Sequence, residues 1–284
     1  MTEEVEHTNP LVKKMQRIIP GTTIRLPSRG IFYKNGEIDS EVQDGEIVVH
    51  PMTTLDEITI RSPDELFKGT AIEKVVGRCA PQIRKPLELF AKDIDYILVQ
   101  LRKISYGNTI ILNFTCPTCM EKAKEDENTP EHEYSVSIDY FINKSKELNI
   151  TDLPKYDITL SNSMVIHLRP SKFNEMIKMN QINDETKSPE EIEDIITSSI
   201  IAVIDHVDNI RDEKLLKEWL KMIPVKVMEE IVSKIAEANN WGPEFSYHIV
   251  CKDCGTKHDI SYILNPVSFF TLPASPKTSP NTES

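Results

Sequence analysis

Two pairs of cysteines carry the clearest chemistry in this sequence. Cys116 and Cys119 form one C-x-x-C turn, and Cys251 and Cys254 form a second. A spacer of two residues lets both sulfurs of a turn reach one ion at about 2.3 Å, and four thiolates suit the tetrahedral coordination of Zn²⁺. Because four protein sulfurs leave no coordination position open, such a metal holds a fold together and runs no reaction. The pattern predicts a four-cysteine zinc ribbon whose second turn, or knuckle, returns after a long insertion.

The same four cysteines have other chemical interpretations. Two disulfides are one, although a reducing compartment disfavours them. Two redox pairs are another, but a redox C-x-x-C opens a helix after a strand, whereas each turn here is predicted to lead into another strand. Iron also fits a four-sulfur site, and it would colour the protein. The spacing favours structural zinc among these interpretations.

Two histidines and a fifth cysteine are further candidates. His132 and His258 each follow a C-x-x-C turn and precede an alternating run, so each is a possible metal ligand. Since four cysteines already satisfy zinc, we expect both histidines to be ordinary strand residues. Cys79 has no other thiol or histidine near it in the sequence. Free cysteine is among the most commonly buried residue types, so we interpret Cys79 as a small buried side chain rather than a nucleophile.

The cysteines need elements that bring them together, and the sequence predicts two hairpins for this purpose. Apolar runs at 109–114 and 245–250 predict a strand before each C-x-x-C turn. Alternating runs at 132–140 and 256–264 predict the partner strands. Because the two hairpins have the same order of features, we expect them to meet across one metal ion.

A strongly periodic helix leads into the first hairpin. Apolar residues three and four positions apart predict this helix from residue 91 to a glycine stop at Gly107. Asp93, Gln100 and Arg102 fall off its apolar stripe. The helix and the zinc ribbon are therefore expected to be joined directly.

The region before this helix is predicted to begin with strands and to continue with short helices. Apolar runs predict strands at 22–27 and 45–50. Thr54 or Asp56 is expected to cap the first helix. The sequence Ser62-Pro63-Asp64-Glu65 is typical of a capping box and predicts the start of the next helix.

A helical insertion is predicted between the two C-x-x-C turns. A hairpin is expected at 158–170, and Ser188-Pro189 then opens a helix whose apolar stripe runs to Ile204. The predicted fold class is α+β, with a β-rich N-terminal part and a four-cysteine zinc ribbon that the insertion interrupts. The predicted layout is a flexible N-terminus (1–21), a β-rich and helical segment with the first zinc knuckle (22–171), the helical insertion (172–240), the second zinc knuckle with closing strands (241–271) and a disordered tail (272–284).

Charge argues against a nucleic-acid partner. The chain has 284 residues, a formal net charge of -12 and a pI near 5.2. Phosphate neutralisation needs clustered Lys and Arg, but the loop after Cys119 is acidic. The alternative of a zinc-ribbon nucleic-acid-binding or transcription-associated factor would require a basic face around the knuckles.

Other classes of protein lack support in the sequence. No apolar run approaches the length of about 20 residues that spans a membrane, and the first residues lack the basic and apolar regions of a signal peptide. We therefore expect a soluble intracellular protein with no membrane contact. No motif with catalytic mechanics is present, so we expect no enzyme activity.

One turn near the N-terminus has two interpretations. Residues 26–33 read L-P-S-R-G-x-F-Y, with Arg29 and Gly30 at the centre. In the first, Arg29 docks a partner or pins the turn. In the second, the segment is a surface turn in which Gly30 supplies a permissive backbone angle. The residues alone favour the second interpretation.

Taken in order, several motifs resemble those of a phage family. They are the turn at 26–33, the helix starts at 52–57 and 62–64, the helix end at 104–107 that leads into the first C-x-x-C, and Trp241-Gly242-Pro243 before the second. Over residues 22 to 265 the chain is similar to T-even-type baseplate proteins of contractile-tailed bacteriophages, which are baseplate hub subunits or hub assembly chaperones.

The resemblance implies a role in assembly. The expected partners are phage baseplate hub proteins, and the expected location is the cytoplasm of the infected bacterium. The protein would either stay in the virion tail as a structural subunit or leave as a chaperone. The expected metal ligands are Cys116, Cys119, Cys251 and Cys254, and the expected contact surface includes Arg29 and Phe32.

Overall fold

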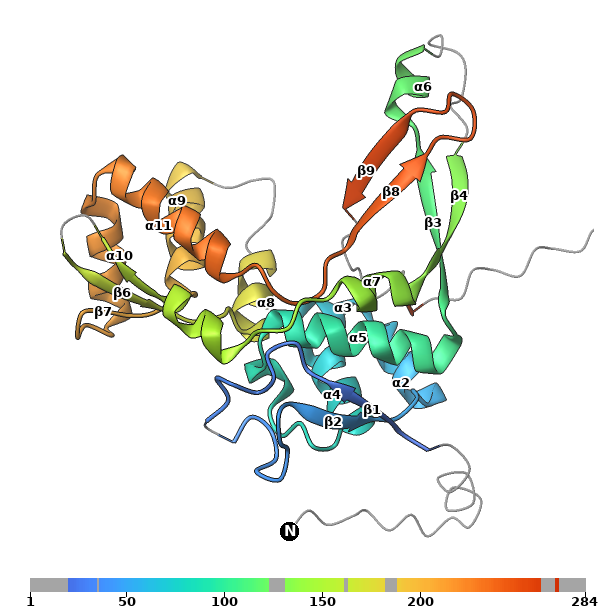
Figure 1. The fold of residues 1–284 in the computed structure, drawn as a ribbon, viewed down its shortest axis with the longest axis horizontal. Coiled ribbons are helices and arrows are strands. Elements are labelled where there is room, and N and C mark those ends of the chain that lie inside the picture. The colour runs from blue at the N-terminus through green and yellow to red at the C-terminus, as the bar shows by residue number, and fades with distance from the viewer. Residues whose placement is uncertain are drawn as a thin grey trace, which may run out of the picture.

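The structure is a computed structural model that describes residues 20–34, 36–122, 131–160, 163–181, 188–261 and 269–270. Predictions for residues 1–19, for the acidic loop at 123–130 and for the tail at 272–284 lie outside these residues. Helices and strands are mixed along the chain, which confirms the α+β class. Figure 1 shows three parts, which we call the body, the arm and the lobe.

The body is built from the N-terminal strands and the helices that cover them. Strands β1 and β2 pair antiparallel, with Ile24 opposite Ile47. The long helix α5 follows the predicted periodic stretch and ends at Gly107, whose φ of 92° suits glycine. The elements of the body are β1 (Thr22–Arg25), β2 (Glu46–Val49), α2 (Thr54–Ile60), α3 (Pro63–Phe67), α4 (Thr70–Cys79), η1 (Pro86–Glu88) and α5 (Ala91–Tyr106).

The short helices of the body are capped differently from the prediction. Thr53, rather than Thr54 or Asp56, caps α2, and its side chain forms a capping box with Asp56. Ser62 precedes α3 but makes no side-chain cap hydrogen bond, so the predicted box with Glu65 is wrong. The Glu65 carboxylate instead pairs with Lys74 Nζ at 2.8 Å.

Helix α5 lies at the centre of the body and is covered on more than one side. Ile94, Ile97 and Leu101 are fully buried, as the apolar stripe predicts. Asp93, Gln100 and Arg102 are buried too, although they lie off the stripe. The reason is that β2, α7 and α8 all pack against α5, so much of its polar face is also removed from solvent.

The arm consists of two hairpins that project from the body (Figure 1). Its elements are β3 (Thr109–Thr115), α6 (Pro117–Lys122), β4 (Glu131–Ser137), β8 (Ser246–Val250) and β9 (Lys257–Ser261). Strand β3 pairs with β4 and β8 pairs with β9, which confirms both predicted hairpins.

The arm differs from the prediction in two places. Strand β4 ends at Ser137, and the chain continues as helix α7 (Ile138–Lys144), which packs on α5. The first C-x-x-C opens the short helix α6, so the prediction that it leads toward a strand, and not into a helix, was wrong. Proline is favoured at the first position of a helix, which explains a helix that starts at Pro117.

The lobe is a three-stranded antiparallel sheet with helices against it. Its elements are η2 (Ile150–Tyr156), β5 (Asp157–Thr159), β6 (Val165–Leu168), α9 (Pro189–Ile201), β7 (Ile204–Val207), α10 (Glu213–Met222) and α11 (Val225–Ala238). Helix α8 (Phe173–Gln181) packs on both α5 and α9. Ser188 and Glu191 form the predicted capping box of α9.

The predicted helical insertion also contains a strand. Helix α9 ends at Ile201, and Ile204 begins β7, so the prediction that this helix runs to Ile204 was wrong. Strand β7 pairs with β6, which lies on the other side of the predicted boundary between residues 171 and 172. A short run of branched apolar residues fits a helix end and a buried strand equally well, so periodicity could not separate them.

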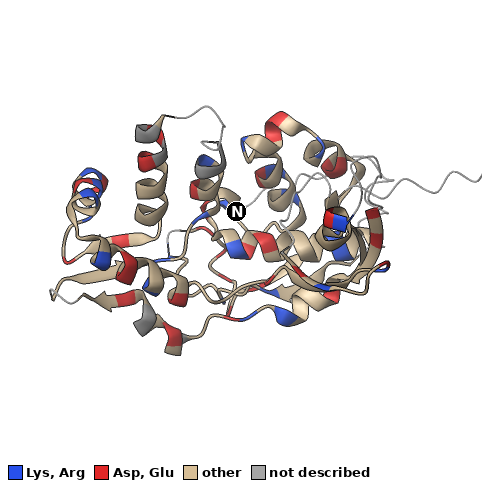
Figure 2. Ribbon diagram, turned by 90° about the horizontal axis from the view of Figure 1, so that it is seen from above, with Lys and Arg blue, Asp and Glu red and all other residues tan. Residues whose placement is uncertain are grey.

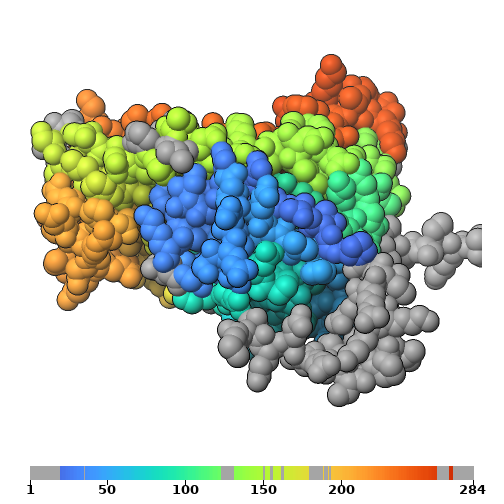
Figure 3. All heavy atoms as spheres, turned by 60° about the horizontal axis from the view of Figure 1, so that its bottom comes forward, coloured from blue at the N-terminus to red at the C-terminus, as the bar shows by residue number. Residues whose placement is uncertain are grey.

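Aromatic rings and one lysine join the body to the lobe. The Phe90 ring stacks on Tyr33 at 4.7 Å and lies edge-on to Trp241 at 6.4 Å. Lys92 Nζ donates to the carbonyl oxygens of Asn239 and Trp241, just after α11. In Figure 3 the first part of the body, drawn in blue, lies between the lobe on one side and the arm on the other. The body and the lobe are thus in direct contact rather than joined only by the chain.

Candidate metal centre

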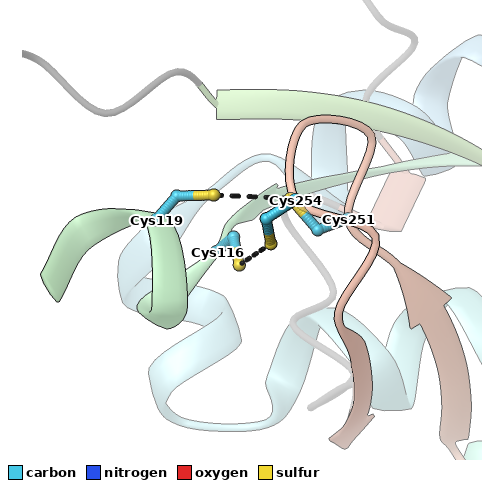
Figure 4. A group of neighbouring side chains, drawn as sticks. All are labelled: Cys116, Cys119, Cys251 and Cys254. Carbon is cyan, nitrogen blue, oxygen red and sulfur yellow. Dashed lines mark hydrogen bonds between the residues drawn. The ribbon is translucent and has the colours of Figure 1, made fainter. Parts of the chain in front are cut away.

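The four paired cysteines converge at the end of the arm (Figure 4). The Sγ atoms of Cys116 and Cys254 lie 3.7 Å apart, as do those of Cys119 and Cys251. All four sulfurs lie within 4.8 Å of one another. Tetrahedral coordination with bonds of about 2.3 Å places sulfurs about 3.8 Å apart. The group therefore has the size of a site that could hold one metal ion.

The two C-x-x-C turns reach this arrangement by the same backbone geometry. The carbonyl of Cys116 accepts a hydrogen bond from the N–H of Met120 at 3.0 Å, and the carbonyl of Cys251 accepts one from Gly255 at 3.0 Å. Each turn therefore closes back on its first cysteine. Because one closed turn follows β3 and the other follows β8, the adjacent hairpins present their sulfurs to a common centre (Figure 4).

Contacts between sulfurs join the two hairpins. The contact of Cys116 with Cys254 and that of Cys119 with Cys251 each join one cysteine of the first hairpin to one of the second. All five cysteines are free thiols. The gathering of four sulfurs from both hairpins at one place favours a shared ion over two separate redox pairs, because a redox C-x-x-C needs only its own two sulfurs.

Close packing shifts the pKa values of Cys119 and Cys254 in opposite directions. Hydrogen bonding by the Thr256 side chain, and then by its backbone, lowers the pKa of Cys254 to about 6. Hydrogen bonds with Cys254 and burial raise the pKa of Cys119 to about 12. A cation at the centre favours ionisation of all four, because metal binding replaces the thiol protons.

Both histidines considered as ligands reach across the arm. They stand on β4 and β9, as predicted. His132 Nε2 lies 2.7 Å from Asp253 Oδ2 in the opposite knuckle, and His258 Nε2 lies 3.1 Å from Cys116 Sγ. His132, Asp253 and Cys251 form a second group with metal-ligand atoms close together. That group shares Cys251 with the four-cysteine group, which has the more uniform and softer ligands that zinc and iron favour.

Arg102 attaches the arm to the body at the end of the arm that is nearest to helix α5. Nothing in the sequence pattern indicated this role. Its guanidinium donates to the carbonyl oxygens of Phe269 at 2.9 Å, Thr109 at 3.3 Å and Gly107 at 3.5 Å. It also lies over the Tyr106 ring, 4.8 Å from the ring centroid. One buried side chain therefore ties the start of β3, and the chain segment after β9, to helix α5.

The structure places Arg29 and Phe32 near the same joint between body and lobe, but in different contacts. Arg29 has a φ of 53° and pairs with Asp44 at 2.6 Å and with Asn149 at 3.2 Å. The Phe32 ring lies edge-on to Tyr156 at 5.2 Å. Arg29 thus pins its turn, and the role of the two residues as a contact surface stays a prediction.

Cys79 is a component of the body core. Its side chain is 2% exposed and belongs to the apolar cluster around α5. Burial, and then the neighbouring Asp56 carboxylate, raise the pKa of Cys79 to about 12. The interpretation of this cysteine as a buried side chain is confirmed.

The fold and the site define a mixed helix-and-strand protein with a four-cysteine centre on a projecting arm. A family model described as T4 bacteriophage base plate protein matches residues 36–271, and the chain belongs to this family. The match covers the arm, the lobe and most of the body. Comparisons with curated proteins and with solved structures found no match. The expected relation to T4-type baseplate proteins is confirmed at the level of the family.

Membership of this family connects the chain with the tail baseplate and with other baseplate proteins. No helix among the described residues is both long enough and apolar enough to cross a lipid bilayer.

Proposed function

We propose that the protein acts in assembly of the phage baseplate hub by binding hub proteins, and that a structural zinc ion holds its arm together. The family match over residues 36–271 carries the assembly part of this proposal. Its metal ligands are Cys116, Cys119, Cys251 and Cys254, whose sulfurs have tetrahedral spacing. The protein works in the host bacterial cytoplasm during assembly.

Zinc suits the arm because the arm is thin and its strands have fewer fully buried apolar side chains than the body. Isolated two-stranded hairpins are at best marginally stable in water, and the arm contains two of them. An ion bound by two sulfurs of each hairpin joins them at their ends. With four sulfur ligands the ion has no open position for a substrate, so its role is structural. The proposal assigns the protein no enzyme activity.

Exposed apolar side chains support protein partners. Met222 and Val225, at the turn between α10 and α11, are 84% and 75% exposed. Leu55 and Ile58 on α2 are 60% and 64% exposed. Contiguous apolar patches on a surface mark sites of protein contact, and we propose that each of these two pairs belongs to such a site. The proposal also includes a smaller contact point at Arg29 and Phe32.

The charge distribution supports protein partners over nucleic acid. Figure 2 shows Lys and Arg interspersed with Asp and Glu along the helices in this view. The net charge of the chain is -12. Binding to a phosphate backbone needs clustered cationic side chains, whereas contacts between proteins tolerate mixed charge.

Metal and protein analysis of purified chain, infected-cell lysate and purified mature particles tests this proposal. We expect one zinc per chain and capture of hub proteins from the lysate by the tagged chain. Presence in mature particles would identify a structural subunit, and absence would identify a chaperone that leaves. A chain without bound metal contradicts the zinc assignment, and capture of no baseplate protein contradicts the assembly role.

A further inference from the structure

Two of the three histidines on the strands of the arm make a reciprocal pair of contacts between the hairpins. His132, on β4 of the first hairpin, contacts Asp253 in the second knuckle. His258, on β9 of the second hairpin, contacts Cys116 in the first knuckle. The two contacts are alike in position but differ in chemistry, since one ends on a carboxylate and the other on a sulfur of the proposed metal centre.

The contact of His258 has a defined direction once Cys116 is a metal ligand. A thiolate can only accept a hydrogen bond, so the imidazole must donate from Nε2. The distance of 3.1 Å between Nε2 and Sγ allows this bond. The Phe114 ring, 5.2 Å from the His258 ring, packs against the imidazole and limits its movement.

Such a bond matters because the centre is rich in negative charge. Four thiolates around one divalent cation leave a net charge of two minus on the group. Hydrogen bonds to the first ligands of a metal orient those ligands, and their loss typically costs about 10- to 100-fold in metal affinity. Cys254 has a comparable neighbour, since the Thr256 hydroxyl lies 3.2 Å from its Sγ.

We propose that His258 is a positioning residue of the metal centre, which donates its Nε2–H to Cys116 Sγ and holds this thiolate toward the ion. This inference rests on the proposed four-cysteine zinc site and goes beyond it, because it assigns His258 a role in metal affinity without making it a ligand. His132 has no such role, since it binds the Asp253 carboxylate.

The test compares histidine variants of the full chain. His258→Phe keeps an aromatic ring beside Phe114 but has no N–H, and His258→Gln keeps an N–H donor. His132→Phe removes the reciprocal contact. His248→Phe is the matched control, because His248 lies on the same hairpin and its side chain is 69% exposed. His258→Leu is a second variant without a donor, for use if the phenylalanine variant does not fold.

Two measurements decide the outcome. Competition with a chelator gives the zinc affinity, and the absorption spectrum of the cobalt-substituted protein reports whether four sulfurs bind the ion. We expect His258→Phe to lower zinc affinity about 10- to 100-fold, with the four-sulfur spectrum unchanged. His258→Gln should recover part of the loss, and His248→Phe and His132→Phe should stay within about twofold of the parent chain.

Three results would overturn the inference in distinguishable ways. Unchanged affinity in both donorless variants would mean that the contact has no role in metal binding. A parent spectrum of three sulfurs and one nitrogen that changes in His258→Phe would mean that His258 is a ligand. No metal binding by the parent chain would overturn the proposed zinc site itself, and the role of His258 with it.

Discussion

The body and the arm hold their strands in place by different means. In the body, β1 and β2 are part of an apolar cluster that surrounds α5, with Ile47, Ile60 and Ile97 fully buried. The strands of the arm contribute fewer buried apolar side chains, namely Ile110, Leu112, Val136 and Ile249, and the first three of these belong to the same cluster. The arm also has two polar attachments. The four sulfurs lie at its far end, and Arg102 binds the start of β3, where the arm meets the body.

We infer from this comparison that metal-binding sulfurs and hydrogen bonds stabilise the arm to a greater extent than apolar burial does, whereas apolar burial stabilises the body. A thin projecting element cannot bury enough apolar surface to offset the entropy of ordering its chain. The arm should therefore open locally at a lower free energy than the body unfolds, as elements with few buried contacts do. The following predictions separate the two regions, beginning with the largest expected effect.

Loss of one sulfur should affect the arm and spare the body. Cys116→Ser is expected to lose the metal and to unfold the arm locally, because apparent zinc-binding free energies of about 10–16 kcal/mol become folding free energy in small zinc domains. Metal analysis and hydrogen exchange of β3 and β8 measure the effect. Helix α5 should keep its slow exchange, since its cluster does not include the four sulfurs.

A second cysteine substitution is the matched control. Cys79→Ala removes a buried thiol from the body but leaves all four sulfurs of the arm in place. This variant should keep one metal per chain and lose some stability in the body. A fully metallated Cys116→Ser chain of unchanged stability would rule out the assignment of the metal ligands.

A cavity in the body should lower the stability of the body and leave metal binding by the arm unchanged. Ile97→Ala in α5 removes a fully buried side chain, and such substitutions cost about 2–5 kcal/mol. Urea unfolding followed by far-UV circular dichroism measures the loss, and metal content should not change. The control is Ile58→Ala on α2, whose side chain is 64% exposed, with an expected change within about 0.5 kcal/mol. Equal losses in the two variants would contradict the assigned core.

Local spacing was enough to predict helix α5 in the body and the two hairpins of the arm, but not helices α6 and α7. The period of α5, its stop at Gly107 and the two hairpins follow from residues close together in the sequence. The convergence of the cysteines followed from the chemistry of two C-x-x-C turns. Pro117 was an available signal for α6, because proline favours the first position of a helix.

The contacts between elements could not be predicted in the same way. Periodicity shows which face of α5 is apolar, but not that other elements also cover Arg102. The apolar run around Ile204 fits either a helix or a strand, and its pairing with β6 depends on the fold of the lobe. The reach of His258 to Cys116 depends on how the two hairpins face one another.

A substitution where the arm meets the body should have an intermediate effect on stability. Arg102→Met removes the guanidinium from the carbonyl oxygens of Gly107, Thr109 and Phe269. Unpairing buried polar groups costs about 1–3 kcal/mol. We expect a loss of this size together with faster hydrogen exchange at the start of β3, while the metal stays bound at the far end of the arm.

The neighbouring lysine provides the comparison for this substitution. Lys103 pairs with Asp139 at 2.7 Å, but both side chains are more than a third exposed. Exposed ion pairs contribute about 0–1 kcal/mol, so Lys103→Met should have a smaller effect on stability and on exchange in β3. If Arg102→Met and Lys103→Met cause equal losses of stability and equal exchange in β3, the Arg102 guanidinium does not hold the arm in place.

The smallest expected effect distinguishes two helix starts with the same sequence signature, one in the lobe and one in the body. Ser188 accepts a hydrogen bond from the N–H of Glu191 at the start of α9, and Ser62 makes no side-chain cap hydrogen bond at the start of α3. Ser188→Ala should therefore cost about 1 kcal/mol, measured by urea unfolding, and Ser62→Ala only a few tenths. Equal costs would mean that the S-P-x-E signature, rather than the hydrogen bond formed in the fold, sets the contribution of the cap.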